Sequence, residues 1–284
     1  MPSNPLQHIF EKRSRWIGKR SVLLVTVMVV VFLLSLGKAA IHWTGLEFLT
    51  LNPLFTSAIA GAIFIIGFML SGVLSDYKEA ERIPTELRVA LEAIDDDVAS
   101  FASEKHGDEL ASLRVVLLAI LKAIRRGLDH EGGHSDLRPA LEAIDDLSPR
   151  FHSLERLGMP ANFVVRLRGL QDNLRRGALR IYYIQAIEFV PSIHILVQTL
   201  VGAVLFLLLF LKTEGSPESA MIFGFVAYMF VYALHLISVL EEPFRKGHGS
   251  MDDVSLFLLR EFEEKLRTRA GISDERKSQA EDER

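Results

Sequence analysis

Apolar residues are concentrated in four blocks of the 284-residue chain, and charged residues are absent or nearly absent from these blocks. The blocks span residues 21–37 (with an apolar extension to about 41), 54–74, 190–211 and 220–240. Each approaches or exceeds the roughly 20 residues that a helix needs to cross the hydrocarbon layer of a membrane. A single block of this kind could be buried in a soluble core, but four of them predict four transmembrane helices.

The first block also has one feature of a signal peptide, because the basic sequence KRSRWIGKR precedes it. The residues that follow the block, Lys38 to Ala40, make a poor cleavage site. A membrane helix is therefore the better interpretation of residues 21–37.

Lysine and arginine predict the orientation in the membrane. Residues 1–20, 75–190 and 241–284 hold five, sixteen and nine of them, whereas the connectors 38–53 and 212–219 hold one each. Because basic segments stay on the cytoplasmic side, we expect both termini and residues 75–190 to be cytoplasmic. The chain would then be a multi-pass protein of the inner cell membrane with two short external loops.

Residues 75–190 are predicted to be helical, because apolar residues recur at spacings of three and four. Breaks in the pattern fall near Gly107, at HEGGH (130–134), and between Pro149 and Pro160. The predicted fold class is therefore all-α, with four transmembrane helices and a large cytoplasmic helical bundle.

An internal repeat with an offset of 50 residues runs through this cytoplasmic region. LRVALEAIDD at 87–96 returns as LRPALEAIDD at 137–146, and residues 86–127 share seventeen identities in forty-two positions with residues 136–177. The repeat predicts two related helical hairpins. A duplicated structural unit is the favoured interpretation, and a ligand site is the alternative.

The sequence HEGGH matches the zinc-protease pattern H-E-x-x-H, which needs both histidines one turn apart on a rigid helix. Its two central residues are glycines, which oppose helix formation, and Ser135 and Asp136 resemble the N-cap of a following helix. We therefore interpret residues 130–134 as a loop and predict no metal site. No other catalytic motif is present, so we expect neither an enzyme nor a bound cofactor.

The charge and cysteine content exclude further classes. A net charge of −4 gives no support for nucleic-acid binding. The chain has no cysteine, so disulfides and thiolate chemistry are excluded.

The second apolar block differs from the others in its small residues, which allow helices to approach closely. These residues are Ala58, Ala60, Gly61, Ala62, Gly67, Ser71 and Gly72. Phe64 and Phe68 stand among them, one helical turn apart on one face. They could simply pack against a neighbouring helix, or they could form an apolar constriction repeated around a symmetric pore.

A few polar residues lie inside the other blocks, among them His194, Gln198 and His235. Such groups often mark an ion path or an interhelical hydrogen bond. Because both histidines lie near the predicted cytoplasmic ends of their helices, interhelical bonding or interfacial placement is the favoured interpretation.

The end of the last apolar block resembles one known family. VAYMFVYALHLISVLEEPF (226–244) is similar to the last transmembrane helix and its exit in bacterial members of the bestrophin channel family. Glu241, Glu242, Pro243 and Phe244 match that exit, and Asp252 and Asp253 match the acidic turn that follows it. GFMLSGVLSDYKEAER (67–82) is similar to the family's second helix, although Asp76, Tyr77 and Lys78 replace its arginine and tryptophans.

The bestrophin resemblance implies a homo-pentamer with one axial pore lined by the second helix. It places Ala60, Phe64 and Phe68 at the hydrophobic neck of that pore, and it makes residues 241–253 a hinge between the last helix and the cytoplasmic bundle. Calcium needs six to eight oxygen ligands. The four scattered carboxylates of this hinge, beside Arg245 and Lys246, make a poor calcium site.

The favoured function is therefore a passive, anion-conducting channel of the bestrophin type, gated at a hydrophobic neck on the second transmembrane helix. Its expected partners are other copies of the chain, inorganic ions and the lipid bilayer. The alternative is a non-conducting membrane scaffold or sensor whose cytoplasmic helices bind a partner protein. The predicted layout has four parts: an amphipathic N-terminal segment with two membrane helices (1–74), the cytoplasmic region (75–190), two further membrane helices (191–240), and a cytoplasmic C-terminal segment with a disordered tail (241–284).

Overall fold

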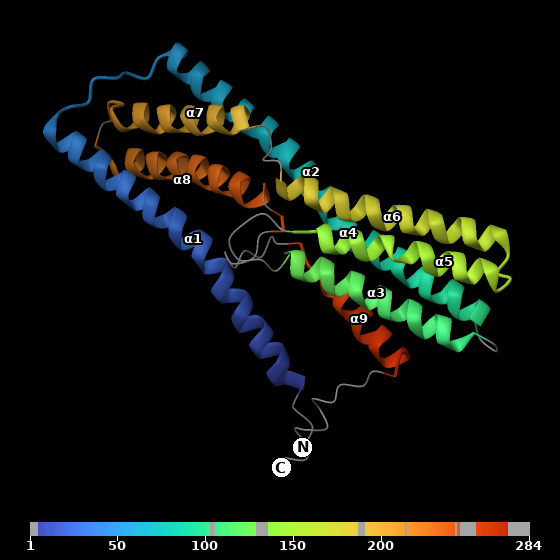
Figure 1. Ribbon diagram of the computed structural model, residues 1–284. Helices are drawn as coiled ribbons and strands as arrows, with labels where there is room; N and C mark the ends of the chain where they lie inside the picture. The colour runs from blue at the N-terminus through green and yellow to red at the C-terminus, as the bar shows by residue number, and fades with distance from the viewer. Residues whose placement is uncertain are drawn as a thin grey trace. The chain divides into compact units, whose positions relative to one another are not determined.

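The structure is a computed structural model of the chain (Figure 1). It describes the backbone of residues 5–102, 106–128, 136–186, 191–213, 215–241, 243–244 and 254–271. Side chains are described from Leu24 onward within these ranges, apart from those of Ala186 and Pro191.

The described residues are almost entirely helical, which confirms the predicted all-α class. The helices are α1 (Pro5–Thr44), α2 (Pro53–Ala102), α3 (Gly107–Leu128), α4 (Arg138–Asp145), α5 (Leu147–Arg156), α6 (Ala161–Ala186), α7 (Pro191–Leu209), α8 (Pro217–Leu240) and α9 (Phe257–Arg269). Four of them, α1, α2, α7 and α8, are long and apolar enough to span a membrane. These are the four helices that the apolar blocks predict.

Helix α2 continues well beyond its apolar block. It runs without interruption from Pro53 to Ala102, although its membrane-type composition ends near residue 74. Pro84 lies inside the helix, where it lacks the N–H that would bond the carbonyl one turn earlier. Strong helix formers are abundant on both sides of this proline, in YKEAER (77–82) and in ELRVALEA (86–93). They explain why the helix continues through Pro84.

The described contacts divide the chain into two compact units. The first contains residues up to Tyr77 and residues 188–243 and 247–253, and the second contains residues 78–187, 244–246 and those from Val254 onward. Helix α2 contributes its apolar part to the first unit and the remainder to the second.

The first unit has an apolar core made by its four membrane-type helices. The core residues are Val27 and Val31 on α1, Ala62, Ile66, Met69 and Val73 on α2, Val197, Val201, Val204 and Leu208 on α7, and Phe223, Ala227, Phe230, Ile237 and Leu240 on α8. They recur at spacings of three and four, so each helix presents one face to the core.

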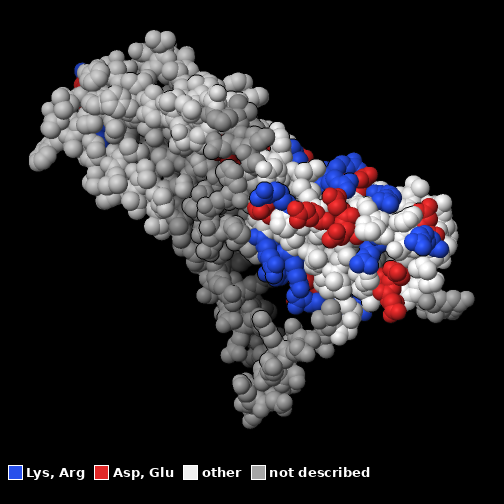
Figure 2. All heavy atoms as spheres, in the orientation of Figure 1, with Lys and Arg blue, Asp and Glu red and all other residues white. Residues whose placement is uncertain are grey.

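The second unit is a bundle in which α3, α4, α5 and α6 pack on one another and α9 packs against α3 (Figure 1). The second part of α2 contacts α3 through Asp95 and Arg114 and contacts α6 through Leu87 and Gly177. Equivalent positions of the two repeat copies are buried alike. These pairs are Leu87 and Leu137, Ala90 and Ala140, Ile94 and Ile144, Leu117 and Leu167, and Ile124 and Leu174. On the face shown in Figure 2, acidic and basic side chains are interspersed over these helices.

The two copies of the repeat are crossed, in the sense that the end of each copy contacts the beginning of the other. A Cβ atom added to Gly127, near the end of the first copy, would lie 2.7 Å from Cδ2 of Leu137, at the start of the second. A Cβ added to Gly177, fifty residues after Gly127, would lie 2.8 Å from Cδ2 of Leu87, fifty residues before Leu137. The glycine at the end of each copy thus leaves room for the leucine at the start of the other copy. The two copies are therefore related by an approximate twofold symmetry.

Candidate functional site

The apolar part of α2 has two opposite faces. Ala62, Ile66, Met69 and Val73 are buried in the core of the first unit. At 100° per residue, Ala60, Phe64 and Phe68 lie on the other side of the helix. The three predicted neck residues therefore share a face that is directed away from the subunit's own core.

This outer face is uncovered in a single chain. Phe64 and Phe68 are 75% and 73% exposed, and Ala60 is also exposed. Exposed phenylalanines on a membrane helix must face lipid, pack against a second copy of the chain, or line a pore that is too narrow to hold free water. The structure thus shows that these rings are not packed inside the subunit.

The exit of α8 holds a polar contact between helices. Glu241, which caps α8, lies 2.9 Å from Nδ1 of His194 at the start of α7. Nε2 of the same histidine lies 2.5 Å from the amide nitrogen of Gln198 one turn later. His194 is therefore bonded to the C-terminal cap of α8 as well as within its own helix.

The remaining predicted residues of the exit divide into two groups. Pro243 and Phe244 are buried, and Phe244 groups with the second unit. Glu242, Asp252 and Asp253 lie outside the described residues, as do the loop at 130–134 and the C-terminal tail. Within the described part of the chain, no three His, Asp or Glu side chains gather as metal ligands would.

A partly buried ion pair, Lys38–Glu47, connects the end of α1 with two loops of the first unit, and the sequence pattern does not predict it. Lys38, on α1, donates to Glu47 at 2.6 Å, to the carbonyl of Leu209 at 3.2 Å, and to the carbonyl of Leu211. The ammonium has three donors, and all three are satisfied here. Its acceptors include carbonyls at the C-terminal end of α7, where the helix dipole favours a cation.

Glu47 completes a set of polar contacts between the α1–α2 and α7–α8 connections, which we call the polar clasp (Lys38, His42, Glu47 and Thr213). It accepts from the backbone N–H and the hydroxyl of Thr213, both at 3.1 Å, and it lies 3.2 Å from Nδ1 of His42. Burial alone would raise the pKa of Glu47, but the hydrogen bonds from Lys38, Thr213 and His42 outweigh it and lower that pKa to about 2. An isolated bridge between Leu49 and Leu211 runs alongside.

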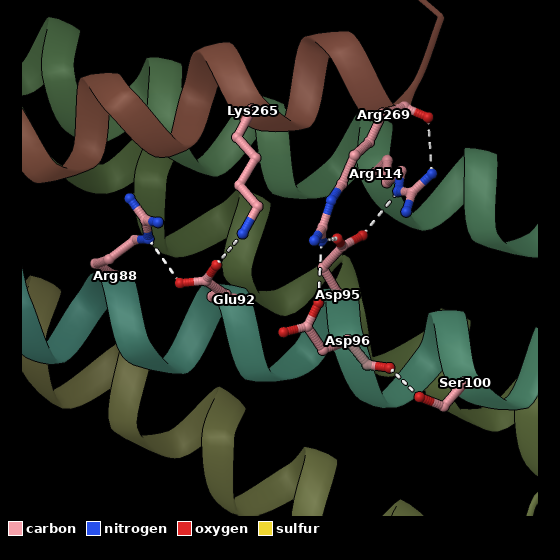
Figure 3. Close-up of polar contacts among 8 residues, drawn as sticks. All are labelled: Arg88, Glu92, Asp95, Asp96, Ser100, Arg114, Lys265 and Arg269. Carbon is pink, nitrogen blue, oxygen red and sulfur yellow. Dashed lines mark hydrogen bonds and ion pairs between the residues drawn. The ribbon is translucent and has the colours of Figure 1, made fainter.

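A second polar network fixes α9 to the second unit (Figure 3). Glu92 on α2 accepts from Arg88 at 2.9 Å and from Lys265 at 2.5 Å. These two cations lower the pKa of Glu92 to about 2, although desolvation opposes the shift. The Arg88 guanidinium also stacks over the ring of Phe262, 4.6 Å from its centroid.

Asp95 is the centre of the other half of this network. It is fully buried, and its two oxygens accept from Arg114 at 2.7 Å and from Arg269 at 2.5 Å. Two guanidinium partners compensate the cost of burying the carboxylate. The local sequence favours a solvated position for Asp95, because it begins a run of three acidic residues (95–97), but its side chain is fully buried.

Comparison with known structures identifies the architecture. The structure matches a bacterial bestrophin homologue from Klebsiella pneumoniae with a TM-score of 0.74, over 87% of this chain and 98% of that one, at 16% sequence identity. Two single-substitution variants of that homologue match with TM-scores of 0.72 and 0.70. The chain has the bestrophin fold.

The match to bestrophin structures covers nearly the whole of both chains, so it includes the helices of both units. No family model and no curated protein matches the sequence. The bestrophin likeness proposed from residues 67–82 and 226–244 is thus confirmed at the level of the fold.

Proposed function

We propose that this protein is a passive ion channel, formed as a homo-pentamer around an axial pore lined by the outer face of α2. The observation that carries the proposal is the uncovered face with Phe64 and Phe68, opposite the packed face of the same helix, in a chain with the bestrophin fold. The protein would lie in the inner cell membrane with both termini in the cytoplasm.

In this arrangement Ala60, Phe64 and Phe68 of each copy would line the neck. Rings of phenylalanine side chains around a narrow axis offer water no hydrogen-bond partner, so such a constriction dewets and stops ions. An ion that crosses it loses hydration without gaining a ligand. The neck would therefore act as a gate, while selectivity would be set elsewhere along the pore.

Anions are the ions that the bestrophin resemblance favours. The reversal potential across a bilayer with a salt gradient tests this directly. A potential near the chloride equilibrium value supports anion conduction, and one near the cation value contradicts it while leaving the channel proposal intact.

The decisive experiment is reconstitution of the purified protein into planar bilayers. Discrete unitary currents are expected, and Phe64→Ala with Phe68→Ala should raise the open probability because the neck becomes wider and wetter. Neither ring is packed within its own subunit, so the variant should still fold. Absence of unitary currents from an intact oligomer would overturn the proposal.

A matched control uses phenylalanines that are exposed on other membrane helices. Phe206 on α7 and Phe225 on α8 are 59% and 64% exposed, so their double alanine variant removes the same side chains from the same unit. Wild-type open probability is expected for this control. If the α2 variant behaved like the control in an intact pentamer, the neck would have to be assigned to another face of α2.

A further inference from the structure

The surface of α2 that receives α9 is a row of three charged residues. Arg88, Glu92 and Asp95 recur at spacings of four and three, so they lie on one face of the helix. Each contacts α9: Arg88 donates to the carbonyl of Leu258 at 2.9 Å, Glu92 binds Lys265, and Asp95 binds Arg269. This row, with α9 on it, belongs to the first copy of the repeat (Figure 3).

The second copy repeats this row on α4. Arg138, Glu142 and Asp145 stand fifty residues after the three residues of α2 and have the same identities and spacing. All three are exposed, whereas in the first copy Asp95 is fully buried beneath α9. Within the described residues, the second copy therefore carries the same charges on α4 without a helix equivalent to α9 on them.

The charges of the α4 row instead bond to near neighbours. Arg138 pairs with Asp136 at 2.9 Å, and Asp145 pairs with Arg175 at 2.6 Å. Arg175 is the repeat equivalent of Arg125, which in the first copy donates to Glu263 of α9 at 2.9 Å. Exposed pairs of this kind contribute little to stability because water screens them, so an incoming helix can replace them.

The face of α3 between Arg114 and Arg125, which both bond to α9, differs from the equivalent face of α6. Leu118 and Leu121, both buried in the first copy, correspond to Arg168 and Gln171 in the second. Helix α9 buries Leu259, Phe262 and Leu266, and the more polar face of α6 would pack less well against these apolar side chains. An α9 helix from a second chain would therefore bind beside α4 more weakly than α9 binds to the α2 row of its own chain. This difference favours another helix as the occupant.

We propose that the α4 row (Arg138, Glu142 and Asp145) is a docking surface for an amphipathic helix of a partner protein. The charge pattern of α9 defines the chemistry of that helix. An aromatic residue stacks under Arg138, a lysine three positions later pairs with Glu142, and an arginine four positions after that pairs with Asp145. This order is Phe262, Lys265 and Arg269 in α9. Its apolar stripe is narrower than that of α9.

A labelled peptide tests this surface on the full-length protein in lipid nanodiscs. The peptide spans residues 255–271 with Leu259→Gln, because that segment carries the required charge order and the substitution narrows its apolar stripe, and binding is followed by fluorescence anisotropy. Saturable binding is expected for the wild type. Glu142→Lys with Asp145→Lys should weaken it about tenfold or more, because two attractive pairs become repulsive.

Charge exchange provides the matched control. A peptide with Lys265→Glu and Arg269→Glu should bind poorly to the wild type and regain affinity for the Glu142→Lys, Asp145→Lys protein. Asp108→Lys with Glu109→Lys adds the same charge to the first turn of α3 in the same unit, and it should leave binding of the original peptide unchanged.

Three outcomes would overturn the proposal: no saturable binding, equal binding by the Glu142→Lys, Asp145→Lys protein, or loss of binding in the α3 control as well. Equal binding would place the peptide on the α2 row, in exchange with α9. Because the chain has no cysteine, a thiol crosslink between Glu142→Cys of one copy and Lys265→Cys of another tests the remaining occupant. Efficient crosslinking would assign the α4 row to a second copy instead. None of these outcomes depends on ion conduction.

Discussion

Gly177 on α6 lies against Leu87 on α2, ninety residues earlier in the chain, and the gap between them leaves no room for a methyl group. A Cβ at this glycine would be 2.8 Å from Cδ2 and 3.2 Å from Cγ of the leucine. The same contact recurs between Gly127 and Leu137. The repeat glycines are therefore packing residues, and their substitution reports directly on the crossed arrangement.

Gly127→Ala should be the more damaging of the two substitutions. Its new Cβ would meet the backbone oxygen of Asp136 at 2.9 Å as well as Leu137, and a backbone atom moves less readily than a side chain. Overpacking of this kind costs about 1–3 kcal/mol, so the thermal unfolding midpoint should fall. Gly177→Ala meets only side chains, and the better helix propensity of alanine offsets part of its cost. Gly169→Ala on α6 meets nothing within 4 Å and should raise the midpoint.

Removal of the Lys38 ammonium should destabilise the first unit. Lys38→Met leaves the partly buried Glu47 carboxylate without its main cation, and leaving such a group without its partner costs about 1–3 kcal/mol. Lys38→Met combined with Glu47→Gln should recover part of that loss, because the uncompensated charge is gone. Lys212→Met, at an exposed lysine on the same connection, is the control. An unfolding midpoint that is equal in Lys38→Met and Lys212→Met would contradict the clasp.

Acid should release α9 through Glu92. The pKa of this carboxyl is about 2 in the folded protein and 4.5 when unperturbed. The stabilisation is therefore complete above about pH 4.5 and is lost as the pH falls toward 2. A buried reporter, Leu266→Cys on α9, should react faster with a pyridyl disulfide over this pH range. With Glu92→Gln added, the reaction should already be faster at neutral pH and should change less on acidification.

The acid effect must be separated from general unfolding. Leu167→Cys, at a fully buried position of α6, reports on the bundle without α9. If this second thiol became reactive at the same pH as the one on α9, the release of α9 would not be a separate event.

Reporter fusions test the orientation in the membrane. A reporter that is active only outside the cytoplasm should be silent when fused after Arg180 or after Arg269, since the basic segments are expected to be cytoplasmic. A fusion within the connection that contains Glu47 should be active and serves as the positive control. Activity after Arg180 or Arg269 would reverse the proposed topology and remove the basis for a cytoplasmic second unit.

The membrane helices could be predicted from the sequence because hydrophobicity is a local property. Each apolar block carries its own signal, and the structure has a membrane-type helix at each one. The same composition predicts the end of the apolar segment near residue 74, but it does not predict that α2 continues to Ala102. That continuation follows from good helix formers on both sides of Pro84, which outweigh the single hydrogen bond lost at the proline.

The polar clasp and the α9 network could not be predicted because their partners lie far apart in the sequence. Glu47 meets Thr213, and Asp95 meets Arg269, and nothing local distinguishes these residues from solvated ones. A lone lysine at the end of an uncharged block was the only available signal for Lys38. The repeat predicted two hairpins, but two similar copies are equally compatible with contacts within each copy and with contacts exchanged between the copies.

The crossed copies have a consequence for how this region could have originated. A chain with one copy of the repeat could make neither leucine–glycine contact within itself, because each contact joins the beginning of one copy to the end of the other. Two such chains could make both contacts by forming a symmetric dimer. Fusion of two such genes would convert that dimer into one polypeptide and free each copy to diverge, as Arg168 and Gln171 on α6 have diverged from Leu118 and Leu121 on α3.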